Sequence, residues 1–240
     1  MRVSPGGGFQ TDTATAAIAH LKAKYEDIWD RNPSKPQQQR DLALRTYRAV
    51  SWFERGDLAR KSGDPDVAFI LYWIALNAAY GRDVDDVTDS GSLQRYLFRL
   101  IELDTRRAIS NAVWDRFFGP ITRLLNNEYL YRPYWDNATG KPDKEDWREW
   151  FDRDNQRADS PGRTRTVLSV LFWRLYTLRN QLVHGSATWR SSLNRDSVED
   201  GADIMEFLIP VFIETMLGNR NEDWGPPFYP PGLHEGRPPR

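Results

Sequence analysis

The segment 63–83, GDPDVAFILYWIALNAAYGRD, constrains the fold more strongly than any other part of the chain. Asp64 is a residue type that caps helix N-termini, Pro65 suits the first helical turn, and Gly81 is a typical helix stop. The residues between these signals are apolar on almost every side. A helix of this kind buries its whole surface, so the segment predicts a helix at the centre of a core.

Helical spacing continues through the rest of the chain, and no segment shows the alternation that is typical of a β-strand. Pro210 lies inside the last predicted helix and should kink it. The chain therefore predicts an all-α protein. Besides the segment above, apolar residues three and four positions apart predict helices over 13–30, from Pro36 to about Gly63, over 163–183, and after Asn194 or Asp196.

We expect three regions along the chain. Residues 1–35 form an N-terminal lead that can hold one helix, 36–218 form the helical domain, and 219–240 form an extended tail because they are rich in proline and glycine. Within the domain, 84–160 begins with an acidic linker and continues with short helices. It is expected to be an insertion between two long core helices.

Composition excludes several kinds of site. The 33 basic and 34 acidic residues give a net charge of -1, so any contact with nucleic acid must be local rather than driven by a global basic field. The absence of cysteine excludes disulfides, a thiolate nucleophile and a Cys-ligated zinc site. The three histidines are too scattered in sequence to predict a metal site. No Gly-rich phosphate loop predicts a nucleotide cofactor, so no cofactor is expected.

The N-terminal sequence and the hydropathy predict where the protein resides. The first twelve residues lack the apolar core of a signal peptide. No run approaches the ~18 apolar residues that a membrane span requires. We therefore expect a soluble, cytoplasmic protein without membrane contact.

The helix predicted over 163–183 ends in RNQLVHG, which runs from Arg179 to Gly185. On a helical wheel, Arg179 falls near the middle of an apolar stripe of leucines. Burying an unpaired guanidinium costs at least several kcal/mol. Arg179 must therefore pair with an internal carboxylate, extend past the helix end, or open into a cleft that needs positive charge.

The end of this helix has two interpretations, which the sequence leaves open. In the first, a histidine in the last turn and a glycine directly after it simply terminate the helix. In the second, Asn180 and His184 lie one turn apart on the same face, beside Arg179, and form a compact polar trio that can hold a phosphate. Trp173 and Tyr176 lie on that face as well.

The spacing Arg179-Asn180-x-x-x-His184 resembles the RNxxxH signature of the HEPN superfamily. The segment 72–81 and the sequence that follows His184 are similar to the Apea-like branch of that superfamily. The resemblance covers 65–81 and 163–230. It implies a HEPN-type bundle of four or five helices, here with a helical insertion, that pairs as a homodimer so that two motifs face each other across a cleft.

The resemblance also implies an activity. Active HEPN proteins are metal-independent endoribonucleases that serve as toxins or as antiviral defence effectors. By analogy, His184 would act as acid or base on RNA, Arg179 would hold the phosphate, and Asn180 would orient one of them. Each motif has one histidine, so acid and base would come from two chains. The products would be a 2',3'-cyclic phosphate and a 5'-hydroxyl, and an antitoxin or regulatory protein would restrain the enzyme.

Three further residues are candidates for substrate binding. Tyr176 could stack a base or line the cleft, or else contact a second subunit. Arg174 and Arg190 could belong to a phosphate track, or else to an ordinary solvated surface. The alternative function is a non-catalytic HEPN dimerisation or binding module. The enzyme hypothesis predicts that Arg179 and His184 are accessible in a cleft, whereas the module hypothesis predicts that they are buried and paired.

Overall fold

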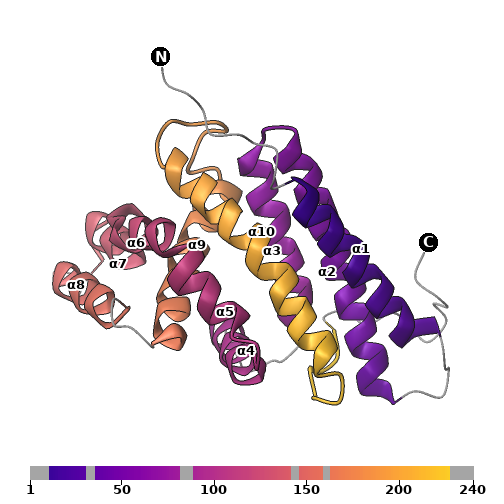
Figure 1. Ribbon diagram of the computed structural model, residues 1–240. Coiled ribbons are helices and arrows are strands. Elements are labelled where there is room, and N and C mark those ends of the chain that lie inside the picture. The colour runs from indigo at the N-terminus through magenta and orange to yellow at the C-terminus, as the bar shows by residue number, and fades with distance from the viewer. Residues whose placement is uncertain (1–10, 31–35, 82–88, 142–145, 159–162, 228–240) are drawn as a thin grey trace. The chain divides into compact units, whose positions relative to one another are not determined.

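A computed structural model describes residues 11–30, 36–81, 89–141, 146–158 and 163–227 (Figure 1). Every regular element in these ranges is helical, which confirms the predicted all-α class. The elements are α1 (Thr11–Asp30), α2 (Gln37–Lys61), α3 (Pro65–Tyr80), α4 (Asp89–Leu103), α5 (Ala108–Asn111), the π-helical turn η1 (Ala112–Arg116), α6 (Phe118–Asn126), the 3-10 turn η2 (Glu128–Leu130), α7 (Arg132–Ala138), α8 (Trp147–Ala158), α9 (Thr164–Val183) and α10 (Arg195–Gly218).

The chain divides into two compact units. The first contains residues up to Leu93 and from Glu206 onward, and the second contains Gln94–Met205. The boundary thus falls inside α4 and inside α10. The second unit combines most of the segment expected to be an insertion with the motif helix α9.

In the first unit, α3 is the buried helix that the sequence predicts. The Asp64 side chain accepts a hydrogen bond from the Val67 amide at 3.1 Å, Pro65 is the first helical residue, and the helix stops at Gly81. Helix α3 packs against α2, with which it forms a hairpin. The rings of Phe53 and Tyr72, one from each helix, are both fully buried and stack with their centroids 5.1 Å apart.

The described part of the tail, 219–227, packs against α2. Arg45, which is fully buried on α2, donates from Nε to the Gly225 carbonyl at 2.9 Å and from a terminal nitrogen to the Pro226 carbonyl. Another terminal nitrogen donates to the Ala79 carbonyl near the end of α3 at 3.1 Å. Trp224 is buried in the same region. Residues 219–227 contain no helix, and Arg45 holds this part of the tail to the helical hairpin.

In the second unit, α9 is the helix around which the others are arranged. Most of its predicted apolar stripe is buried, and α6, α8, η1 and η2 pack against the helix. The last two positions of the stripe differ from the prediction, because Leu182 is half-buried and Val183 is exposed near the helix end. Arg123 on α6 donates two hydrogen bonds, at 2.8 and 2.6 Å, to Asp200 near the start of α10. The buried residues of the stripe are Val167, Leu168, Leu171, Phe172, Leu175 and Leu178.

No helix in the described ranges combines the length and the apolar character that crossing a membrane requires.

Candidate functional site

The backbone at the end of α9 follows the helix-end interpretation. Gly185 has a φ of +70°, in the left-handed region that favours glycine. Its amide donates to the Leu182 carbonyl at 3.3 Å, and the Ser186 amide donates to the Gln181 carbonyl at 2.9 Å. These two bonds form a Schellman motif, which satisfies carbonyls that the helix leaves unpaired. The Schellman motif therefore explains Gly185. It does not explain the polar side chains of Arg179, Asn180 and His184 that precede the glycine.

The polar and aromatic face of α9 lines an open groove in the second unit. His184, Asn180, Tyr176 and Trp173 all contribute to its surface, and the groove has a volume of about 1330 Å³. Pockets for small molecules occupy about 300–1,000 Å³, so this groove has room for a larger, extended ligand. The other walls come from the η2–α7 segment and from the loop and helix start at 186–197. The histidine side chain is exposed.

Arg179 lies beside the groove without being part of its lining. Its side chain is half-buried, and a terminal nitrogen donates to Asn180 Oδ1 at 2.9 Å. No carboxylate of the described residues lies within ion-pair distance of this guanidinium. The structure thus places Asn180 and His184 in the lining of the groove, and Arg179 outside the lining, hydrogen-bonded to Asn180.

Arg174 does not lie in the groove. Only 2% of its surface is exposed, and the guanidinium carbon lies 4.4 Å from the Tyr131 ring centroid and 4.8 Å from that of Phe151. It donates to the Leu125 carbonyl at 3.4 Å and to Asn155 Oδ1 at 3.2 Å. Burial lowers the pKa of Arg174 to about 10. This arginine stabilises the packing of η2 and α8 on α9, and its position gives no support to a phosphate track.

Arg190 and Tyr176 are placed differently from each other. Tyr176 lines the groove, and its ring meets that of Trp173 edge to face, with centroids 6.0 Å apart. Arg190 is exposed on the loop after the motif, where its guanidinium lies 4.6 Å from the Trp189 ring centroid. It is not among the residues that line the groove. Of the three predicted substrate-binding residues, the groove contains Tyr176 alone.

Gln181, one of the spacer positions of the motif, holds the opposite wall of the groove. Its side-chain nitrogen donates to the Tyr129 carbonyl at 2.8 Å. The same carbonyl accepts a hydrogen bond from Trp135 Nε1, also at 2.8 Å. One oxygen therefore joins the motif helix to η2 and α7. Sequence reasoning did not assign Gln181 any role, because the partner lies 52 residues away in the chain.

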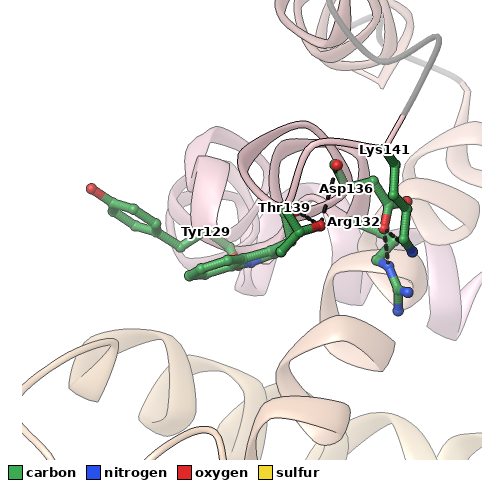
Figure 2. A network of polar contacts seen from close by, with 6 residues as sticks. Tyr129, Arg132, Asp136, Thr139 and Lys141 are labelled. Atoms are coloured by element: carbon green, nitrogen blue, oxygen red, sulfur yellow. Dashed lines mark hydrogen bonds and ion pairs between the residues drawn. The ribbon is translucent and has the colours of Figure 1, made fainter.

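The α7 wall carries a second polar cluster, which sequence reasoning also missed (Figure 2). Arg132 Nε and Lys141 Nζ both donate to Asp136 Oδ1, at 2.9 and 2.8 Å. Burial raises the pKa of Asp136, but the hydrogen bonds and charges of Lys141 and Arg132 outweigh that effect and hold the pKa below its ordinary value. The four-residue spacing of Arg132 and Asp136 indicates an ion pair on a helix. It does not indicate that the pair faces the motif.

Comparison with protein-family models, with curated proteins and with solved structures finds no match for this chain. The resemblance to HEPN proteins therefore depends on the motif, its position at the end of α9, and the flanking segments. In the described part of the chain, no three His, Cys, Asp or Glu side chains are grouped so that they could hold a metal ion.

Proposed function

We propose that this protein is a metal-independent endoribonuclease of HEPN type that cleaves RNA at the groove beside α9. The observation that supports the proposal is the accessibility of Asn180 and His184, two of the three motif residues. His184 is exposed and lines the groove with Asn180, and the described residues offer Arg179 no carboxylate. A motif that only stabilised the fold of this chain would instead be buried and paired. The alternative, a dimerisation module, would pair these residues with a second copy, and the experiment below tests it.

The proposed reaction needs one base, one acid and one cation. A neutral His184 takes the proton of the RNA 2'-hydroxyl while the 2'-oxygen attacks the adjacent phosphorus. The bond from phosphorus to the 5'-oxygen breaks, and a protonated His184 from a second copy of the chain gives that oxygen its proton. Arg179 stabilises the negative charge on the non-bridging oxygens, and Asn180 keeps the guanidinium in place. The products are a 2',3'-cyclic phosphate and a 5'-hydroxyl.

The homodimer in this proposal needs a surface near the motif. Three large apolar side chains are exposed at or just beyond the end of α9, namely those of Val183, Trp189 and Leu193. Large exposed apolar side chains that are close together in the sequence are candidates for a protein–protein contact. We propose that the second copy docks here. The role as a toxin or defence effector, restrained by an antitoxin or regulatory protein, belongs to the same proposal.

The decisive experiment compares the wild type with His184→Ala and Arg179→Ala on a mixed-sequence RNA in EDTA. Loss of a general acid–base should lower the rate by about 10²–10⁴-fold. Fragments ending in 2',3'-cyclic phosphate should form with the wild type and not with His184→Ala or Arg179→Ala. His20→Ala is the matched control, because His20 is also exposed but lies on α1, in the other unit. It should cleave like the wild type.

Two outcomes would contradict the proposal. If His184→Ala cleaves as fast as His20→Ala, the activity does not depend on the motif. The second outcome is that neither the wild type nor any variant cleaves, and that Arg179→Ala and His184→Ala unfold at a lower temperature than the wild type. The motif then supports a dimerisation or binding module instead.

A further inference from the structure

The wall that faces α9 across the groove carries aromatic rings and cations that the proposed reaction does not use. Trp135 is 39% exposed, and Tyr129 is exposed beside it. Arg132 and Lys141 are exposed as well, and all four residues line the same groove as His184. Cations beside exposed aromatic rings are the combination with which proteins hold single-stranded nucleic acid.

We propose that the η2–α7 wall is a nucleotide-binding subsite, in which an unpaired base stacks on Trp135 and a neighbouring phosphate binds Arg132 and Lys141. The inference rests on the proposed function, because it assumes that the strand in the groove is RNA. The subsite would hold a nucleotide away from the bond that is cut, and it would select single strands, since the bases of a duplex are not free to stack on protein.

The Trp135 ring is held in place before any ligand binds. Its Nε1 donates to the Tyr129 carbonyl at 2.8 Å, and the Tyr134 ring meets it edge to face, at 90° and with centroids 5.1 Å apart. Figure 2 shows the same segment, with Tyr129 labelled together with the charged cluster of Arg132, Asp136 and Lys141. A ring fixed by such contacts loses little freedom when a base stacks on it.

The two cations are placed by Asp136. Both donate to the same carboxylate oxygen, so the cluster keeps one net positive charge. Arg132 uses Nε for this bond, which leaves the terminal nitrogens for another acceptor, and Lys141 uses one of three N–H groups. The side chains of Arg132 and Lys141 are 61% and 51% exposed, so a phosphate can reach them.

The subsite is fixed relative to the motif through Gln181. The side chains of Gln181 and Trp135 both donate to the Tyr129 carbonyl, so two hydrogen bonds to one oxygen connect the Trp135 ring to the last turn of α9. In the proposed subsite, this connection would help to hold a base on Trp135 at a set distance from a phosphate near His184, as positioning of a scissile bond requires.

The test measures binding separately from cleavage. All variants are made in a His184→Ala background and bind a fluorescein-labelled 12-nucleotide mixed-sequence RNA, followed by anisotropy. Trp135→Leu should weaken binding by about 5- to 150-fold, the loss expected for one stacked base. Lys141→Gln should weaken it less and reduce the slope of log K against log salt by about 0.7, the value for one phosphate on a single strand. A duplex of the same sequence should bind at least about tenfold more weakly.

Matched controls come from the other unit. Trp52 is 41% exposed on α2, close to the exposure of Trp135, so Trp52→Leu controls for the loss of a partly exposed indole. Lys22, which bonds to Glu54 at 2.7 Å, provides Lys22→Gln as the control for Lys141. Both controls should bind like the parent. Lys141 is exposed, so Lys141→Gln should fold like the parent. The slope of log K against log salt for this variant therefore still tests the subsite if Trp135→Leu disturbs folding.

The outcomes separate this inference from the proposed function. Binding that depends on Trp135 and Lys141, in a protein whose wild type does not cleave, supports the subsite and refutes the ribonuclease. If the wild type cleaves, but Trp135→Leu and Lys141→Gln have the same Kd as their controls, the subsite alone is refuted. Failure of the oligonucleotide to bind any variant refutes the subsite as well.

Discussion

Gly56 lies on α2 where the Tyr72 ring of α3 crosses the helix. A Cβ atom added at Gly56 would lie 2.5 Å from both Cδ1 and Cε1 of that ring, and 3.4 Å from the Ala68 carbonyl oxygen. Carbon atoms are at optimal contact near 3.5–4.0 Å, so the ring would have to retreat by roughly 1 Å. It has no room to do so, because it is fully buried and stacked on Phe53. We therefore expect Gly56→Ala to strain the α2–α3 hairpin.

Two opposing effects set the size of the change. Replacing a mid-helix glycine with alanine contributes about 1 kcal/mol of helix stability. Overpacking a core costs about 1–3 kcal/mol, and two ring atoms of a locked side chain place this site near the upper end. The net expectation is a destabilisation of about 2 kcal/mol. For a chain of this length, that lowers the melting temperature by about 4–8 °C.

The measurement is thermal and urea unfolding of the wild type, Gly56→Ala and a control, Gly218→Ala. An added Cβ at Gly218 meets nothing within 4 Å, so the control should melt at or slightly above the wild-type temperature. In a Tyr72→Val background, where no ring atom remains, Gly56→Ala should lose its penalty. An unchanged melting temperature, or a penalty that persists with Tyr72→Val, would refute the steric explanation.

Three further predictions concern the helix end, the tail and the α7 wall. Gly185→Ala should cost about 1–2 kcal/mol in urea unfolding, because its φ of +70° disfavours a Cβ; equal stability would contradict this. Arg45→Met removes the hydrogen-bond donor to a carbonyl of the tail and to one at the end of α3, so we expect the free energy of unfolding to fall by about 3 kcal/mol. Proteolysis within 219–227 should become faster, and an unchanged cleavage pattern would contradict the role of Arg45 in holding the tail. Asp136 has a lowered pKa when folded, so its stabilising contribution is present above its ordinary value of 3.8 and is lost as the pH falls through the folded pKa. Asp136→Asn should therefore melt below the wild type from about pH 5 to 8, with a difference that shrinks below about pH 4; a constant difference would contradict this.

The sequence by itself determined the helices and many of their ends. Asp64, Pro65 and Gly81 delimit α3, and Gly185 closes α9, where the structure has these boundaries. These signals act through contacts within one turn of helix, so neighbouring residues are enough to specify them. The apolar stripe of α9 was equally readable, because its period is a property of the helix alone.

Only the tertiary structure decided what the polar residues of α9 contact. Spacing places Arg174 and Gln181 on the helix surface, but it does not show what each side chain contacts. In the structure, Arg174 lies against the rings of Tyr131 and Phe151. Gln181 donates a hydrogen bond to the Tyr129 carbonyl. The hydrogen bond that holds the tail to α2 joins residues still farther apart, since Arg45 and Gly225 are separated by 180 positions. Such contacts form when distant elements pack together, and a local pattern has no means of encoding which elements will meet.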